Sequence, residues 1–160
     1  MAVLQQNRWL LGAISAALIS SVAMWEGKRN VPYRDSANVL TVCYGYIGSD
    51  IQNRPYSNEE CNILLRKEVV IHAEGVLGCV KKPMKENEFN AFVLMAYNVG
   101  VNGFCNSQTV KVFNAGHNEQ ACRLIAYRPN GTPNWSYVNG KFVQGLFNRR
   151  LYEMKMCLGE

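Results

Sequence analysis

Two carboxyl side chains and one hydroxyl near the start of the chain have the types and spacing to hydrolyse a glycosidic bond. Glu26, Asp35 and Thr41 lie in WEGKRNVPYRDSANVLTVCYG, where one acid follows an apolar stretch and the other a polar turn. Such hydrolysis needs a protonated carboxyl that releases the leaving sugar and an ionised carboxylate that activates water. Taken singly, Glu26 is more typical of a helix end, Asp35 of a turn and Thr41 of a strand.

A small β-hairpin region must position the second acid and the hydroxyl. Val39, Leu40, Val42 and Tyr44 are residues that favour strands. Glycines then break the pattern, and Arg54-Pro55 marks a loop. We therefore interpret residues 30–56 as the β region of the fold.

Helices follow this region. Ser57-Asn-Glu-Glu60 is a capping box and opens a helix whose apolar face continues to about residue 77. A second helix begins after Pro83, and its stretch Phe89–Val99 is apolar on nearly every side, as in a core helix, until Gly100 and Gly103 end it. Further on we expect short helices at 107–116 and 118–127, a loop at 128–133, a turn at Asn139-Gly140 and a final basic helix at 143–158. The pattern predicts one α+β domain.

An uncharged run precedes Glu26. Residues 9–25, WLLGAISAALISSVAMW, number seventeen, which is the lower limit for a helix that spans a bilayer. Arg8 supplies a positive flank, which favours an N-terminus that stays in the cytoplasm.

Four interpretations of this run compete. The first is a permanent membrane anchor, which would normally be more apolar. The second is a plain core helix of a soluble protein, and the third and fourth are a cleaved signal peptide and an uncleaved export segment. Cleavage after Ala23, where Ser21-Val22-Ala23 fits a signal-peptidase site, would leave Glu26 near a free end with no helix to hold it. We favour a segment that exports the protein, stays uncleaved and later leaves the bilayer.

The composition of the chain limits the kinds of molecule that it is expected to bind. The formal net charge of +5 favours association with anionic polymers or surfaces, although it also fits a soluble domain with a modest charge excess. The chain has no Lys/Arg-rich run and no basic stripe interleaved with aromatic residues, so we expect no nucleic-acid binding.

Six cysteines form an even set without CxxC spacing, and neither histidine lies near a cysteine at zinc-site spacing. We therefore expect no metal and no cofactor. With an export signal, three disulfides are the leading interpretation, and buried free thiols are the alternative. Sequence alone permits about fifteen connectivities. The cysteines are Cys43, Cys61, Cys79, Cys105, Cys122 and Cys157.

Longer motifs carry a family resemblance over residues 24–158. The spacing of the three candidate residues resembles the catalytic triad of T-even-phage-type lysozymes, glycoside hydrolase family 24. The segments TVCYGYIG, YSNEECNILL, AFVLMAYNVGVNGF and GLFNRRLYE follow in family order. The uncharged N-terminal run resembles that of signal-anchor-release endolysins of lambdoid phages, and it contains no cysteine that could exchange with an inhibitory disulfide.

The resemblance implies residue roles and a fold. Glu26 would be the general acid, Asp35 the ionised partner that activates water, and Thr41 the residue that holds this water, in an inverting mechanism. Asn98 would bind sugar or peptide in the cleft, or else cap its helix. The implied fold is lysozyme-like, with a small β-hairpin lobe and a mainly helical lobe joined by a long helix. Many family members have His at the position of Tyr46, so the hydrogen-bonding partner of this residue stays open.

Disulfide pairs and two arginines complete these expectations. Cys43–Cys61 and Cys122–Cys157 match cysteine positions of related endolysins. Cys79–Cys105 would join the end of the connecting helix to the loop after the core helix. We expect Arg149 and Arg150 to be surface or structural cations rather than substrate contacts.

The resemblance implies a phage endolysin that cleaves the β-1,4 bond between N-acetylmuramic acid and N-acetylglucosamine in peptidoglycan. We expect residues 1–25 to be the signal-anchor-release segment and 26–160 the catalytic domain, acting as a monomer. The protein would be held inactive at the host inner membrane through 9–25 and later act in the periplasm. A non-catalytic wall-binding or membrane-anchored protein on the same fold is the alternative, and a holin-like membrane protein is the third possibility.

Overall fold

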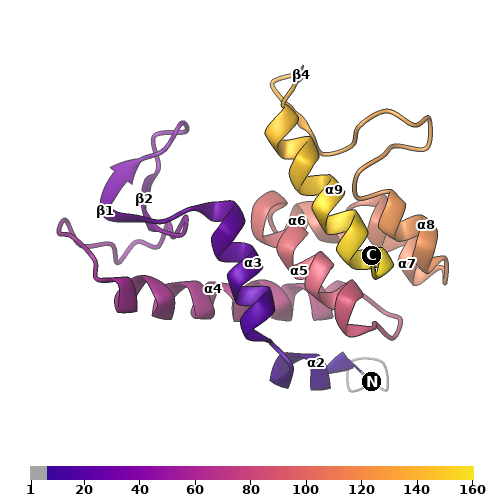
Figure 1. Ribbon diagram of the computed structural model, residues 1–160, viewed down its shortest axis with the longest axis horizontal. Coiled ribbons are helices and arrows are strands. Elements are labelled where there is room, and N and C mark those ends of the chain that lie inside the picture. Colours follow the sequence, from indigo (N-terminus) through magenta and orange to yellow (C-terminus); the bar gives the residue numbers. More distant parts are fainter. Residues whose placement is uncertain (1–6) are drawn as a thin grey trace. The chain divides into compact units, whose positions relative to one another are not determined.

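A computed structural model describes residues 7–160 and divides the chain into two compact units. The smaller unit is Ser15–Ile71, and the larger unit joins the N-terminal residues up to Ile14 to His72–Glu160. The long helix α4 (Asn58–Cys79) continues from one unit into the other, as the sequence predicts (Figure 1). Small sheets beside many helices confirm the α+β class.

The smaller unit contains the candidate triad. Its elements are α3 (Ala16–Glu26), β1 (Arg29–Arg34), β2 (Leu40–Cys43) and the first part of α4. The two strands are antiparallel, with Tyr33 opposite Thr41 and an irregularity in the register between Arg29 and Tyr33. The predicted β region at 30–56 is therefore present as one short hairpin followed by turns.

A capping box starts α4 at the predicted place. The Glu60 backbone N–H donates to Ser57 Oγ at 3.0 Å, and the Ser57 N–H donates to Glu60 Oε2 at 2.8 Å. These two bonds satisfy donors that the first turn of a helix leaves without partners. Because this signal is local, the sequence locates the start of α4 correctly.

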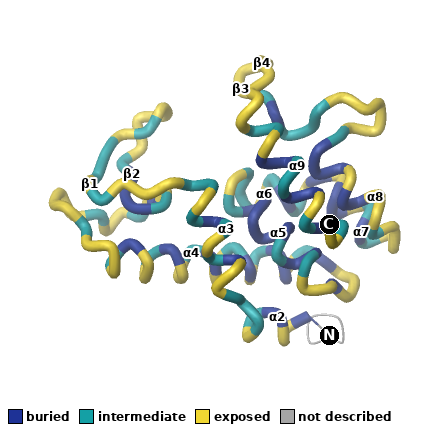
Figure 2. The backbone as a smooth tube through the Cα atoms, viewed as in Figure 1, coloured by how far each residue is buried: buried dark blue, intermediate teal, exposed yellow. Residues whose placement is uncertain are grey.

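The larger unit is helical around a buried core helix. Its elements are α2 (Trp9–Gly12), the end of α4, α5 (Glu86–Val99), α6 (Val101–Cys105), α7 (Gln108–Asn114), α8 (Asn118–Arg123), β3 (Tyr137–Val138), β4 (Lys141–Phe142) and α9 (Gln144–Leu158). The middle of α5 is buried, as its apolar sequence predicts (Figure 2). The Phe92 ring packs against Phe104 and Phe113, each with centroids 5.2 Å apart.

Two helices differ from the prediction. The core helix was expected to end at Gly100 and Gly103, and α5 does end at Val99, but a further helix, α6, follows it and contains Gly103. Its packing depends on another glycine, because a Cβ on Gly75 of α4 would lie 2.6 Å from the Val101 side chain. The expected helix to Tyr127 ends early, since α8 stops at Arg123 and turns follow it.

The Asn139-Gly140 turn is confirmed. It joins β3 to β4, and both residues have positive φ, 50° and 77°. A two-residue hairpin loop of this kind needs positive φ at both positions, which Asn and Gly tolerate best.

The uncharged run 9–25 is two helices in this structure. α2 ends at Gly12, and Ser15 begins α3 with an extended backbone and a side chain that accepts a bond from the Leu18 N–H at 3.1 Å. A Ser cap of this kind starts a new helix rather than continuing the old one. No helix within residues 7–160 has the length and apolar character needed to cross a bilayer.

Candidate active site

The Asp35 carboxylate is fixed by its own turn. Asp35 Oδ1 accepts bonds from the backbone N–H groups of Ala37 and Val39, both at 2.9 Å. The Asp35 N–H in turn donates to the Val39 carbonyl at 3.0 Å. Asp35 Oδ2 makes no hydrogen bond to any residue that the structure describes at 7–160. One carboxylate oxygen is therefore committed to the backbone, and the other is available to a ligand.

Thr41 is held close to this turn. It lies on β2, is 3% exposed, and its hydroxyl donates to the Val39 carbonyl at 2.9 Å. Because the single proton of the hydroxyl is used, Thr41 Oγ1 can only accept a further bond. The structure thus links Asp35 and Thr41 through one backbone residue.

Glu26 ends α3 and approaches the turn after β2. The side chain is half-buried, and its Oε1 atom has almost no exposed surface. Gly45 has φ +82°, and a Cβ on this residue would lie 3.5 Å from Glu26 Oε2. The backbone of Gly45 therefore borders the carboxyl group. Glu26, Asp35 and Thr41 all belong to the smaller unit.

A disulfide secures the end of β2. Cys43 has φ +62° and is bonded to Cys61 on α4. Both cysteines are buried in a small core with Val42 and Tyr46. This core lies directly after Thr41 in the chain and fixes the end of its strand.

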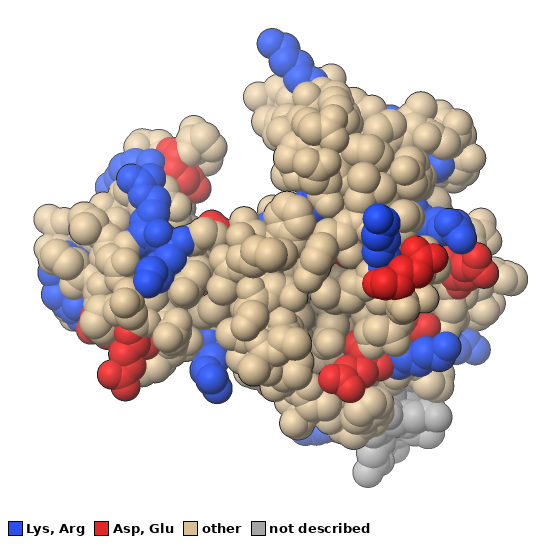
Figure 3. All heavy atoms as spheres, in the orientation of Figure 1, with Lys and Arg blue, Asp and Glu red and all other residues tan. Residues whose placement is uncertain are grey.

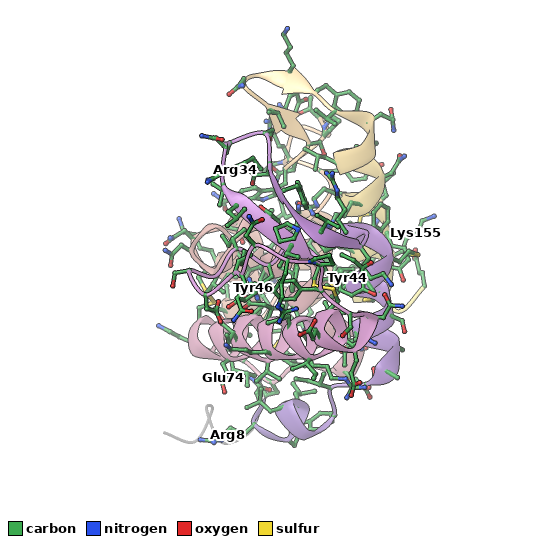
Figure 4. The ribbon with its side chains drawn as sticks, turned by 90° about the vertical axis from the view of Figure 1, so that its left-hand side faces the viewer. Arg8, Arg34, Tyr44, Tyr46, Glu74 and Lys155 are labelled. Atoms are coloured by element: carbon green, nitrogen blue, oxygen red, sulfur yellow. A yellow bond between two sulfur atoms is a disulfide. The ribbon has the colours of Figure 1, made fainter. Side chains whose placement is uncertain are left out.

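Tyr46 has a partner within its own turn. Its hydroxyl bonds to Asp50 Oδ1, and Gly48 leaves the space for this contact, because a Cβ there would overlap the Tyr46 ring. The bond to Asp50 raises the pKa of Tyr46 to about 12, with burial as the second cause. The same bond lowers the pKa of Asp50. Figure 4 labels Tyr44 and Tyr46 on either side of Gly45 in the chain.

Asn98 belongs to the larger unit, whereas Glu26, Asp35 and Thr41 belong to the smaller one. It lies exposed in the last turn of α5, and its Oδ1 accepts a bond from Arg150 Nη2 at 2.8 Å. Gly100, rather than Asn98, is the C-cap of α5. The bond to Arg150 orients the side-chain amide with its oxygen toward α9.

Sequence comparison places these residues in a family, because the model for phage lysozyme matches residues 23–153. The chain belongs to the phage lysozyme family. A SAR-endolysin, a signal-anchor-release endolysin, of Bacteriophage PS119 is 35% identical over 134 residues, covering 83% of this chain and 76% of the relative. A SAR-endolysin of Pseudomonas phage phiKMV is 33% identical over 153 residues, covering 95% and 92% of the two chains.

A solved structure agrees with this family assignment. The muramidase domain of SpmX from Asticaccaulis excentricus superposes with a TM-score of 0.78 and 25% identity, covering 91% of this chain and 97% of that one. The lysozyme-like fold predicted from the sequence is therefore confirmed.

The two arginines of α9 are structural in this lysozyme-family chain, and neither is on the surface. Arg149 and Arg150 are buried, and both bond to Glu153 Oε1, at 3.3 and 2.9 Å. Arg149 Nη2 also donates to the Leu94 carbonyl on α5 at 3.3 Å. Burial raises the pKa of Glu153 to about 7, against the lowering effect of both arginines. Glu153 was not among the residues predicted from the sequence, although its place three residues after Arg150 allows an ion pair along the helix.

The structure contains the three expected disulfides. They are Cys43–Cys61, Cys79–Cys105 and Cys122–Cys157. Among the residues described, no three His, Cys, Asp or Glu side chains are grouped so that they could hold a metal ion.

Proposed function

We propose that this chain is an endolysin muramidase that hydrolyses the β-1,4 bond between N-acetylmuramic acid and N-acetylglucosamine in peptidoglycan during host lysis. Membership of the phage lysozyme family supports a glycoside hydrolase. The observation that carries the site assignment is the fixed Asp35 carboxylate, with one oxygen bonded to two N–H groups in a turn whose Val39 carbonyl also accepts the Thr41 hydroxyl. The net charge of +5 suits an anionic wall polymer, and Figure 3 shows Lys and Arg side chains on both units.

In the proposed mechanism, one water molecule donates hydrogen bonds to two acceptors. Water would donate one proton to Asp35 Oδ2 and the other to Thr41 Oγ1, because neither atom has a proton to give. A lone pair of the water oxygen would then point toward the anomeric carbon. Glu26 would hand its proton to the leaving oxygen as the glycosidic bond breaks, and Asp35 would take the proton of the attacking water. Attack from the opposite face inverts the configuration.

Product analysis tests the reaction. Purified protein on purified peptidoglycan should release new reducing N-acetylmuramic acid ends, detected by mass spectrometry after borohydride reduction. Reduced N-acetylglucosamine ends would point to a different bond. Binding without any new reducing end would favour the alternative, a non-catalytic wall-binding protein.

We further propose that residues 9–25 form an uncleaved membrane segment that holds the protein inactive at the host inner membrane until it is released into the periplasm. The SAR-endolysin of phage phiKMV, whose match covers 95% of this chain, supports this assignment. Residues 26–160 would then be the catalytic domain. With the segment in the bilayer, Glu26 would lie at the membrane surface, whereas in the described structure it ends α3 near Gly45.

A more apolar segment tests the release. Gly12→Leu with Ser15→Leu removes the glycine and the helix cap that separate α2 from α3. The double variant should remain in the membrane fraction and fail to lyse cells, with its N-terminus intact by mass spectrometry. Normal lysis by this variant, or a mature chain that starts at Met24, would refute an uncleaved releasing segment.

We also propose that the enzyme acts as a monomer, because the three residues of the proposed triad come from one unit of one chain. Size-exclusion chromatography with activity measured across the eluted fractions tests this. Activity confined to a larger species would contradict it.

A further inference from the structure

The side chain of Asn7 is inserted into the loop between α4 and α5. It is 2% exposed, and its Nδ2 donates to the Lys82 carbonyl at 2.9 Å. The Met84 backbone N–H donates to Asn7 Oδ1 at 3.0 Å. One amide thus satisfies both a donor and an acceptor of the loop backbone, which buried backbone groups require.

A second asparagine binds the same loop in the same way from α7. The Lys81 N–H donates to Asn114 Oδ1 at 2.7 Å, and Asn114 Nδ2 donates to the Cys79 carbonyl at 3.0 Å. The loop from Cys79 to Met84 is therefore held by the side-chain amides of Asn7 and Asn114, each of which donates one bond to the loop backbone and accepts one from it. They differ in their place in the chain, because Asn7 precedes the uncharged run 9–25 and Asn114 lies far beyond it.

An apolar contact accompanies Asn7. Leu10, three residues later and on α2, is fully buried, whereas Arg8 and Trp9 between them are exposed. Positions three apart lie on the same side of a helical turn. The segment Asn7–Leu10 thus presents one polar and one apolar anchor to the larger unit, to which it belongs.

We propose that the loop at residues 80–84 is a docking site for the chain's own N-terminal segment, with Asn7 as the latch that closes only after residues 9–25 have left the bilayer. This inference rests on the proposed membrane segment. In the membrane-held form, Asn7 precedes the span and the loop follows it, so the two lie on opposite sides of the bilayer. The two hydrogen bonds can form only once the N-terminus has crossed.

The two hydrogen bonds of Asn7 favour the released form over the membrane-held form. These bonds exist in the released form alone, so they stabilise that form and not the membrane-held one. Re-entry of the segment into the bilayer would require both bonds to break. Asn114, whose bonds need no crossing, stabilises both forms equally.

Trypsin cleavage after Arg8 measures the latch directly. Arg8, which Figure 4 labels, is the only Lys or Arg before Lys28; it directly follows Asn7 in the chain and is exposed. In purified full-length protein, Asn7→Ala should speed this cleavage by about tenfold or more, the change expected for two lost hydrogen bonds. Asn7→Asp replaces the donor with a second oxygen that faces the Lys82 carbonyl in a buried position, so it should speed cleavage at least as much as Asn7→Ala.

Asn114→Ala is the matched control, since it removes the same pair of side-chain hydrogen bonds from the same loop. It should leave cleavage after Arg8 at the wild-type rate. Equal rates for wild type and Asn7→Ala would overturn the proposal, and so would an equal acceleration by Asn114→Ala. Because this assay needs no enzymatic activity, failure of the latch is distinguishable from failure of the proposed muramidase function.

Cell fractionation then tests the link to release. Asn7→Ala should keep a larger share of the protein in the membrane fraction than Asn114→Ala and should delay lysis. Identical fractions for the two variants would contradict a role in release.

Discussion

The hydroxyl of Thr41 and the backbone N–H of Asp35 donate to the same atom, the carbonyl oxygen of Val39, at 2.9 and 3.0 Å. Val39 in turn donates its N–H to the Asp35 carboxylate. The residues proposed to hold and to activate water are therefore coupled through one short turn. Substitutions of Thr41 and of Asp35 therefore have different expected effects.

Thr41→Val should reduce turnover on peptidoglycan by about 10–100-fold, because the water loses one of its two acceptors and is misplaced. The fold should lose no more than about 1.5 kcal/mol, the upper value for one hydrogen bond. Thr41→Ser restores the hydroxyl and should recover most of the rate. Initial rates of reducing-end release compare the three proteins, and a Val variant with wild-type turnover would exclude a water-holding role.

Asp35→Asn should separate the structural and chemical roles of this residue. The amide oxygen can still accept the bonds from Ala37 and Val39, so the turn should persist. The loss of the charge removes the general base, which should lower turnover by about 10²–10⁴-fold. Thermal unfolding and rates measured on the same sample test both halves. An active Asn variant would show that Asp35 does not activate water.

Tyr46 should ionise at unusually high pH. Its bond to Asp50 raises its pKa from 10.0 to about 12, so its stabilising effect is present below pH 10 and is lost as the pH rises through 12. Asp50→Asn should move the pKa of Tyr46 back toward 10. The difference in absorbance at alkaline pH between wild type and Tyr46→Phe isolates this phenol from the other tyrosines. An unchanged titration in Asp50→Asn would contradict the assigned partner.

The α4 cap should weaken in acid. The bond from Arg54, followed by that from the Ser57 N–H, lowers the pKa of Glu60 from 4.5 to about 2. Its contribution to stability is therefore present above pH 4.5 and is lost as the pH falls toward 2. Glu60→Gln removes this titration. The difference in melting temperature between the two proteins should shrink over that pH range, and a constant difference would refute the assignment.

Local signals were predicted well from the sequence. The Ser57–Glu60 cap and the Asn139-Gly140 turn depend on neighbouring residues, so short motifs were sufficient to locate them. The helix break at Ser15 was missed because the uncharged run has no strong stop signal, and the cap there is a single serine.

Long-range contacts were not predicted. Arg150 meets Asn98 across fifty-two positions, and Asn7 meets Met84 across seventy-seven. Nothing in the local pattern specifies either partner, since packing of distant helices creates both. The burial of Arg149 and Arg150 likewise depends on α5 and on the neutralising Glu153.

The role of Glu26 as general acid is tested by the rate of reducing-end release from purified peptidoglycan by wild type, Glu26→Gln and Glu74→Gln. Glu74 is an exposed acid on α4 and serves as the charge-matched control. Glu26→Gln should fold normally and lose about 10²–10⁴-fold in rate, because Gln cannot protonate the leaving oxygen. Glu74→Gln should retain the wild-type rate. A folded Glu26→Gln protein that releases reducing ends as fast as Glu74→Gln would show that Glu26 is not the general acid.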